Sequence, residues 1–324
     1  MQRNAPGAQR ADSGAQVARD SSGVVLPLAR RVCAAQRHGS VCFTKAASAA
    51  ATPRLRRLAD RNGDVLTSTS SYTLPSATFL MLIISAGMAK SGSTYAFHLL
   101  NGLAVTAGFA DSLASREKHR LEGFLGKQNN FVNRLLWKRL GHLWWVAAKE
   151  GRFVVKTHEP LNGASKFLIR CSAVRTVYIY RDPRDCLLSA LDYGAKVRER
   201  GFGPEYFAKL QTFDDALREV KKWIAIWRAF QSTAGVLSIR YEDLLSTPDD
   251  VLKRCADYLK LRVDAKGRRK VLWDYSRDNP ARRGRMPLNK AVAYRYRTEM
   301  PPEQRRRFRD EFGDNLVKMD YALD

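Results

Sequence analysis

The sequence predicts an α/β fold with a central parallel sheet flanked by helices. Two observations predict it: short apolar and β-branched runs alternate with longer segments of helical spacing, and the composition supplies a core. Strands and helices in alternation are typical of parallel sheets with right-handed crossovers. Of the 324 residues, 45% are hydrophobic and 10% aromatic, which argues against wholesale disorder despite a formal net charge of +24.

The first part of the chain, residues 1–78, lies outside this pattern. It is rich in Ala, Arg, Ser and Gly, poor in acids, and without a sustained hydrophobic period. Such a composition does not build a core. Three interpretations stay open: a disordered tail, a targeting peptide, or leader sequence upstream of a natural start at Met81. We therefore expect one functional domain over residues 79–324.

The first half of that domain begins with a buried strand. Phe79–Ala86 is an apolar run that ends at Gly87, and Thr94–Val105 follows with apolar residues three and four apart, which predicts strand, turn and helix. Phe131–Ala148 has helical spacing with basic and aromatic side chains. Arg152–Val155 is short and partly β-branched, which predicts a second strand.

The second half repeats the alternation. Arg175–Tyr180 is β-branched and aromatic and predicts a third strand, and Asp182–Arg200 reads as a helix with Pro183 in its first turn, where a missing N–H costs least. The remaining expected elements are a helix over Val220–Phe230, a strand over Val236–Arg240, and a helix from a Thr247 cap to Leu259.

Charge and cysteines narrow the class of protein without identifying a partner. A sequence pI near 10.2 favours an anionic partner, but nucleic acid, glycan, anionic lipid and phosphorylated cofactors fit equally. Five cysteines without a CxxC pair fit neither a disulfide framework nor a zinc cluster, so we expect a reducing compartment. The solid apolar run Phe79–Ile84 is far shorter than the roughly 20 residues of a membrane span.

The loop Gly87–Thr94, GMAKSGST, is the first candidate binding element. Between a strand and a helix, its backbone N–H groups and the helix dipole would converge on a phosphate or sulfate. It is not a Walker A loop, because Lys90 stands two residues before Gly92 rather than directly after it. An ordinary turn with a solvated lysine is the open alternative.

A second candidate is the pair Lys156 and His158 at the end of the strand RFVVKTH. Residues two apart in a strand share a face, so both would project beyond the carboxyl ends of the strands, where open α/β sheets bind ligands. A neighbouring cation lowers the pKa of the imidazole and favours the neutral form, which can accept a proton. A structural role is the alternative, and we assign it to the other histidines: His38, His98, His119 and His142.

The third candidate is Arg181 with Ser189. Arg181 ends a strand and Ser189 lies two turns into the next helix, so a guanidinium and a hydroxyl could hold one phosphate. The alternative is a salt-bridge cluster at the helix start, which Asp182 and Asp185 in the first turn would support independently.

In sequence, these segments resemble the sulfotransferases that use 3′-phosphoadenosine 5′-phosphosulfate (PAPS). KSGST is similar to that family's KSGTT loop, KTHEP to KTHLP, and YRDPRDCLLSALDY to RNPRDxxxSxxxxY with the same gap from Arg to Ser. RYEDL before a TP-initiated helix is similar to the family's YEDL element. The resemblance covers about Leu80 to Tyr321, in the family's order, and implies a fold like that of the P-loop NTPases.

The resemblance also implies residue roles. Lys90 and the amides of Ser91, Gly92, Ser93 and Thr94 would bind the 5′-phosphosulfate, Arg181 and Ser189 the 3′-phosphate, and Tyr95 and Tyr193 the adenine. His158 would be the general base, and Lys156 and Lys90 would offset charge on the transferring group. The family's RKGxxGDW element is incomplete here: Arg283 and Gly284 are the nearest match, with Asn289–Arg295 as an alternative alignment.

We therefore expect in-line sulfuryl transfer from PAPS to a hydroxyl or amine of a small molecule or glycan, with 3′-phosphoadenosine 5′-phosphate (PAP) as product and without a metal. We expect a cytoplasmic protein with no nucleic-acid or membrane partner. The alternatives are a P-loop nucleotide kinase and a basic nucleic-acid-binding protein. The latter is suggested by the positive charge and by Trp137, Trp144 and Trp145, which we interpret as ordinary helix core. Neither the acceptor nor the oligomeric state is encoded in a recognisable motif.

Overall fold

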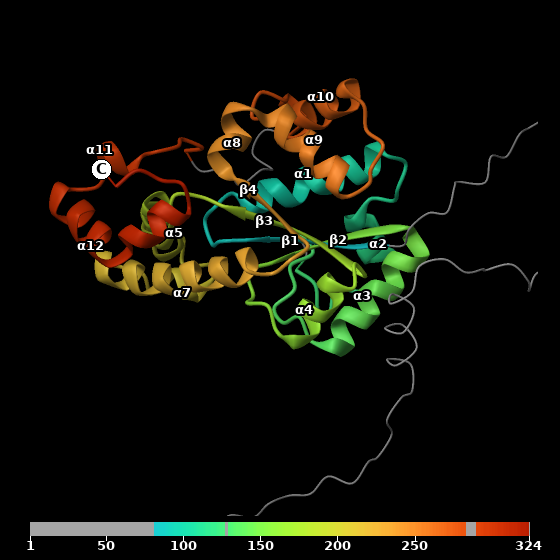
Figure 1. The fold of residues 1–324 in the computed structure, drawn as a ribbon, viewed down its shortest axis with the longest axis horizontal. Helices are drawn as coiled ribbons and strands as arrows, with labels where there is room; N and C mark the ends of the chain where they lie inside the picture. The colour runs from blue at the N-terminus through green and yellow to red at the C-terminus, as the bar shows by residue number, and fades with distance from the viewer. Residues whose placement is uncertain (1–80, 127–128, 283–289, 324) are drawn as a thin grey trace, which may run out of the picture. The chain divides into compact units, whose positions relative to one another are not determined.

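Four parallel strands form the centre of the computed structural model, which describes residues 81–126, 129–282 and 290–323 (Figure 1). The strands are β1 (Met81–Gly87), β2 (Arg152–Thr157), β3 (Val174–Tyr180) and β4 (Val236–Arg240), in the order β2-β1-β3-β4. This confirms the predicted fold class. The boundary at residue 78 and the residues Arg283 and Gly284 lie outside the described part of the chain.

The strand order places a ligand-binding crevice beside β1. Met81 pairs with Arg152 of β2 on one side, and Leu82 pairs with Val174 of β3 on the other. The chain thus runs from β1 outward to β2 and then returns past β1 to β3. β1 and β3 stay paired as far as Gly87 and Ile179, but the connections that follow them leave in opposite directions. A crevice outside the carboxyl ends of the strands is expected there, the usual ligand site of an open α/β sheet.

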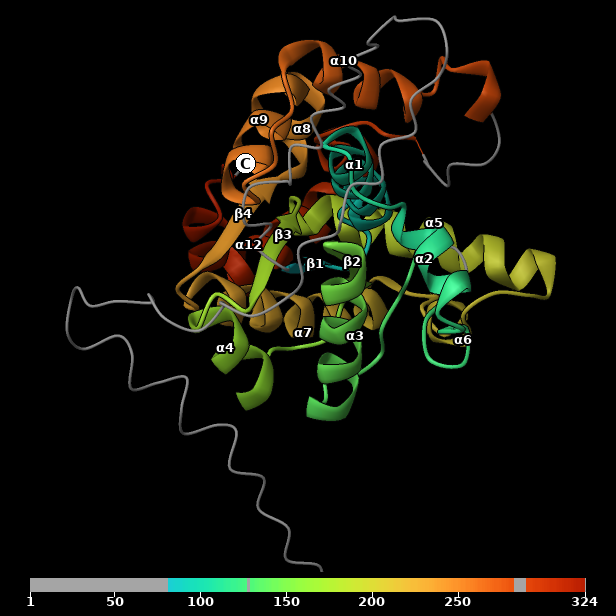
Figure 2. The same cartoon turned by 90° about the vertical axis from the view of Figure 1, so that its right-hand side faces the viewer.

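Alternating side chains divide the core into two halves. Leu82 and Ile84 face one half and Met81 and Ile83 the other, and all four are nearly or fully buried. The first half packs against α3 (Trp137–Glu150), α4 (Gly163–Arg170), α5 (Pro183–Arg200), α7 (Phe213–Gln231) and α12 (Pro302–Lys318). The second packs against α1 (Ser93–Thr106), α8 (Tyr241–Ser246), α9 (Pro248–Tyr258) and α10 (Ala265–Asp274), seen above the sheet in Figure 2.

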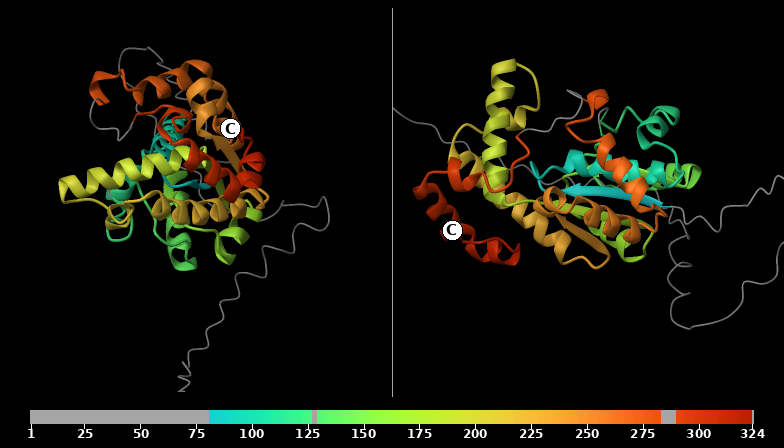
Figure 3. Two further views of the ribbon diagram at one scale, coloured as in Figure 1. Left: turned by 90° about the vertical axis from the view of Figure 1, so that its left-hand side faces the viewer. Right: turned by 90° about the horizontal axis from the view of Figure 1, so that it is seen from above.

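Short helical elements lie between the longer helices and strands. They are α2 (Ser112–Lys118), α6 (Glu205–Ala208), a 3-10 turn (Pro280–Arg282) and α11 (Tyr296–Glu299). In Figure 3, the C-terminal half of α5, in yellow-green, projects beyond the end of the sheet. Residues on that half can therefore reach the crevice outside the strand ends.

The expected helix boundaries differ from the observed ones where local capping decides. α7 begins at Phe213 rather than Val220, because Thr212 and Asp215 form a capping box that starts the helix earlier. At α9, Thr247 occupies the N-cap position, but its hydroxyl donates to the carbonyl of Asp243 and does not cap the helix. Residues 131–136 are not helical, and Phe131 instead makes a parallel bridge to Lys156.

The three tryptophans of α3 are not core residues. Trp137, Trp144 and Trp145 are 56%, 39% and 49% exposed, so their interpretation as ordinary helix core is wrong. The buried side of α3 consists of aliphatic residues: Leu140, Leu143, Val146 and Ala147. The helix therefore has two apolar sides, one aromatic and one aliphatic. The aliphatic side is the one that packs against the sheet.

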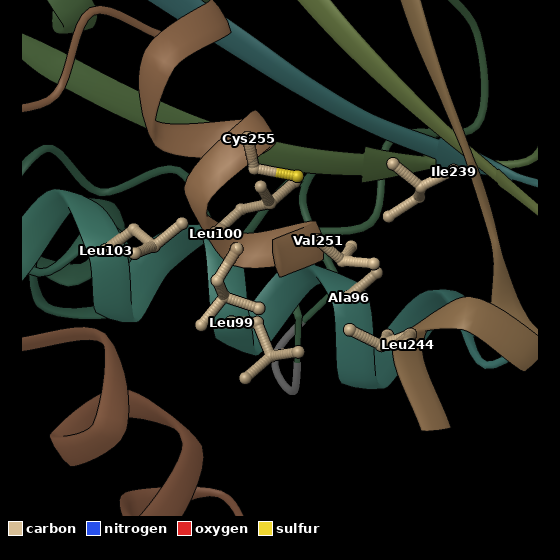
Figure 4. Close-up of a pocket in the computed structure, with 9 residues that line it drawn as sticks. Ala96, Leu99, Leu100, Leu103, Ile239, Leu244, Val251 and Cys255 are labelled. Atoms are coloured by element: carbon tan, nitrogen blue, oxygen red, sulfur yellow. The ribbon is translucent and has the colours of Figure 1, made fainter. Parts of the chain in front are cut away.

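A small apolar cavity of about 10 Å³ lies between α1, α9 and β4. Figure 4 shows aliphatic side chains and the sulfur of Cys255 around it. With no polar group in its lining and room for no more than a water molecule, it is a packing gap and offers no site for chemistry. Within the described residues, no helix is long and apolar enough to cross a membrane.

Candidate active site

A polar cleft of about 500 Å³ opens beyond the carboxyl ends of β1, β2 and β3. Ten residues expected from the sequence line it: Lys90, Gly92, Ser93, Thr94, Tyr95, Lys156, His158, Arg181, Ser189 and Tyr193. These residues come from segments up to about a hundred positions apart, so the fold brings the three candidate elements together. Ser91 does not line the cleft.

Ser91 instead holds the loop between β1 and α1 in shape. It is fully buried, and its hydroxyl donates to the carbonyls of Met88 and Ile179, at 2.7 and 3.2 Å. Gly92 has a φ of +82°, and a Cβ there would lie 2.6 Å from the ring of Tyr241. Only glycine fits that backbone and that close approach without strain.

The loop leaves the start of α1 open to a ligand. The N-cap residue, Gly92, has no side chain to satisfy the first-turn amides. The first helical hydrogen bond runs from the amide of Ala96 to the carbonyl of Gly92, so the amides of residues 93–95 have no partner within the helix. Together with the helix dipole, these amides favour an anion such as a phosphate or sulfate.

His158 is held as a neutral base. Its Nδ1 lies 2.7 Å from the carbonyl oxygen of Gly87, which can only accept, so Nδ1 carries the proton and Nε2 keeps its lone pair. The Ser93 hydroxyl lies 3.4 Å from Nε2. Burial, and then the charge of Lys156, lowers the pKa of His158 to about 3, so the ring is neutral at physiological pH. It can accept a proton from a group bound in the cleft.

Two lysines in the cleft are held without a neutralising carboxylate among the described residues. Burial lowers the pKa of Lys90 and of Lys156 to about 8, and each ammonium lowers the pKa of His158 further. The Lys90 ammonium lies 3.9 Å from the ring centre of Tyr193, an attraction that supports the cation without neutralising it. The site therefore favours an anionic ligand, which would supply the missing counter-charge.

Arg181 forms the salt bridge considered for it and also lines the cleft. Its Nη2 donates to Asp185 at 2.8 Å and to the carbonyl of Val292 at 2.5 Å, as a salt-bridge cluster at the start of α5 requires. Its buried Nε has no partner in the described structure, while the residue still lines the cleft. Ser189, 4% exposed, lines the same cleft from α5. A guanidinium with an unused donor beside a hydroxyl fits a phosphate.

Nine lining residues were not named individually as site residues from the sequence. They are Asn129, Lys196, Arg200, Pro204, Phe207, Tyr241, Lys290, Ala291 and Arg295. Two signals could have found some of them: Tyr241 belongs to the RYEDL segment, and the alternative alignment Asn289–Arg295 contains three others. Arg295 is tied to Asp192 and Glu299, which raise its pKa, so it is a fixed part of the cleft wall.

Comparison with known proteins gives one family. Residues 82–320 match a family model described as the sulfotransferase domain. A curated relative, Cytosolic sulfotransferase 17 of Arabidopsis thaliana, is 27% identical over 124 residues, which make up 35% of this chain. The match spans about a third of the relative's length, 34%.

Solved structures with a similar arrangement include two complexes. Retinol dehydratase in complex with retinol and PAP aligns with a TM-score of 0.49 and 17% identity, over 75% of this chain and 83% of that one. Mouse sulfotransferase SULT7A1 complexed with PAP aligns with a TM-score of 0.48 and 15% identity, over 73% and 84% of the two chains.

Proposed function

Since the chain belongs to the sulfotransferase domain family, we propose that it transfers a sulfuryl group from PAPS to an acceptor hydroxyl or amine. One observation carries the proposal: a neutral histidine, two lysines without a paired carboxylate and a phosphate-type Arg–Ser pair line a single cleft. The histidine and the two lysines fit the phosphosulfate end of PAPS. The Arg–Ser pair fits its 3′-phosphate end.

The residues of the cleft fit the donor. The amides at the start of α1 and the Lys90 ammonium would hold the 5′-phosphosulfate, where the helix end lacks a partner. The guanidinium of Arg181 and the hydroxyl of Ser189, two residues that line the cleft, would hold the 3′-phosphate. The rings of Tyr95 and Tyr193 would contact the adenine. Arg283 and Gly284 would complete the 3′-phosphate site as the resemblance implies.

The donor supplies an activated sulfuryl group, whose bond to the 5′-phosphate breaks as the bond to the acceptor oxygen forms. His158 takes the acceptor proton at Nε2, while Gly87 fixes the ring through Nδ1. Lys156 offsets charge on the transferring group, and Lys90 offsets charge on the leaving phosphate oxygen. Binding a polyanion raises the pKa of His158 toward its ordinary range, which makes it a better base once the donor is bound.

We extend the proposal to the acceptor, the cellular compartment and the metal requirement. The acceptor is a small molecule or glycan, and the protein acts in the cytoplasm, as its cysteine pattern and the name of its plant relative support. Transfer needs no divalent cation, because lysines and amides supply the positive charge. A chelator should therefore leave turnover unchanged, whereas a nucleotide kinase would lose activity.

Thermal-shift titration with PAP and with ADP tests donor recognition directly. We expect PAP to stabilise the full chain far more than ADP, because only PAP carries a 3′-phosphate. Ser189→Ala should weaken PAP binding about tenfold and leave the response to ADP unchanged. Ser232→Ala, at an exposed position of α7's end, is the matched control. Equal stabilisation by the two nucleotides would refute the assignment.

A further inference from the structure

Five large apolar side chains lie exposed on neighbouring parts of one surface. They are Leu136 (47%), Trp137 (56%), Trp144 (39%), Trp145 (49%) and Phe167 (40%), and together we call them the α3–α4 aromatic face. None of them lines the active-site cleft. Grouped exposed aromatic residues of this size mark a surface that contacts something else.

The face is continuous from α3 to α4, which lie together on one side of the sheet (Figures 1 and 2). The rings of Trp137 and Phe167 have centres 5.8 Å apart. Trp144, seven residues after Trp137, repeats its position on the helix two turns later. Between them Gly141 adds no side chain, and nothing lies within 4 Å of the position its Cβ would take. The aromatic rings thus form one open strip.

The same surface is basic. Residues 129–149 contain four Lys or Arg and no Asp or Glu, and α4 adds Lys166 and Arg170. Lys138 and Lys149 are exposed beside the tryptophans. The acid that follows, Glu150, is already bound by Lys118 and His119, at 2.9 and 2.6 Å. The positive charge of this face is therefore not neutralised from within that helix.

We propose that the α3–α4 aromatic face docks on an anionic membrane surface. Indole rings at the headgroup level, flanked by lysines and arginines that contact lipid phosphates, are the pattern of an interfacial helix. The cytoplasmic leaflet carries the negative potential that such a face requires. Docking differs from spanning, so the proposal agrees with the absence of a spanning helix among the described residues. It departs from the expectation of no membrane partner.

A single-stranded nucleic acid fits the arrangement less well. Such ligands are held in a basic groove, with bases stacked on rings that line it. Trp137, Trp144 and Trp145 stand on the outward side of one helix, opposite its buried face. Side chains that project outward from a helix suit a flat headgroup layer better than a strand held in a groove. Binding to a single-stranded nucleic acid is therefore measured as an alternative result in the experiment below.

Vesicle flotation with the full chain tests the proposal. We expect binding to vesicles of phosphatidylcholine with about 30% phosphatidylserine, weak binding to phosphatidylcholine alone, and release at high salt. Trp144→Ala with Trp145→Ala should lower the partition coefficient at least about tenfold, as should Lys138→Glu with Lys149→Glu. Trp273→Ala is the matched control, since Trp273 is 54% exposed on α10, in the layer on the other side of the sheet.

Two further measurements control for misfolding of the variants and for binding to nucleic acid. An unchanged response to PAP in thermal shift shows that the tryptophan variants are folded. A labelled single-stranded oligonucleotide is titrated into the same proteins. The proposal is overturned by any of three results: no binding to anionic vesicles, vesicle binding that the α3 variants leave unchanged, or tryptophan-dependent binding to the oligonucleotide without vesicle binding.

Discussion

Two charged regions meet at the carboxyl ends of the strands and differ in how their charges are balanced. In the cleft, Lys90 and Lys156 are largely buried without a paired carboxylate among the described residues, and burial lowers the pKa of each to about 8. At the start of α5, Asp182 and Arg184 are also buried but bind each other at 2.8 Å. Both regions hold charges that are largely withdrawn from water, and only the region at the start of α5 has its counter-charge built in.

The paired region extends to the end of the chain. Asp182 donates its backbone N–H to Glu242, whose other oxygen accepts the hydroxyl of Tyr321 at 2.8 Å, and Arg184 donates to the carbonyl of Ala322. These bonds fasten Tyr321 and Ala322 to the start of α5. The comparison indicates that buried charges with a paired counter-charge support the fold. Buried charges without one lower its stability and leave the cleft able to bind an anion.

The largest effect is expected from the neutral base. His158→Ala should lower kcat about 10²- to 10⁴-fold, because no base then accepts the proton of the acceptor group. The affinity for PAP should change less than about twofold. Initial rates and calorimetric titration with PAP measure the two quantities. His142→Ala, exposed on α3, should change neither. Equal loss of turnover and of PAP affinity would remove the assigned role.

Removal of the Lys156 charge should lower activity without lowering the thermal stability of the protein. Lys156→Met should lower kcat about 10²- to 10³-fold, since a charge aimed at the transferring group is lost. The thermal midpoint should stay the same or rise, because a buried charge without a carboxylate no longer has to be desolvated. Lys253→Met, at an exposed pair with Asp257, serves as control. A large drop in midpoint would mean that Lys156 is structural.

The opposite result is expected in the paired region. Arg184→Met leaves Asp182 buried without its partner and should lower the free energy of unfolding by about 3–5 kcal/mol, measured by urea denaturation. The folded fraction should still bind PAP. Arg218→Met breaks a solvent-facing pair with Asp215 and should leave the free energy of unfolding nearly unchanged. Similar losses from the two variants would contradict the contrast.

The smallest effect is a pH dependence of the free enzyme. Lys90 and Lys156, with pKa values of about 8, lose their protons above that pH, so kcat/KM for the donor should fall there. His158, with a pKa of about 3, stays neutral, so no decline is expected between about pH 5 and 7. A bound polyanion raises the lysine pKa values, so kcat should decline at higher pH than kcat/KM. A decline of both at the same pH would contradict this.

Local patterns sufficed to predict the sheet and ten of the residues that line the cleft. Lys156 and His158 share a strand face, and Arg181 and Ser189 lie eight residues apart on one strand–helix unit, so spacing alone places each pair. Gly92 is fixed by its positive φ and by Tyr241, a contact that spacing does not contain. The expected amide role of Ser91 stays a prediction, and in the structure this amide donates to the carbonyl of Met88.

Long-range packing decided the rest. Arg295 reaches the cleft through its ion pair with Asp192, a hundred residues earlier in the chain, and no local pattern reports such a contact. Trp137, Trp144 and Trp145 have helical spacing, but spacing does not tell which of two apolar faces a sheet will bury. Helical spacing therefore predicted the helix, whereas the interpretation of its three tryptophans as core residues was wrong.

A crystal structure of the protein grown with PAP tests the central claim most directly. The account predicts the 5′-phosphate on the first-turn amides of α1 beside Lys90, and the 3′-phosphate within hydrogen-bonding distance of Arg181 and Ser189. PAP bound at another place, or bound here with its 3′-phosphate away from both residues, would contradict it.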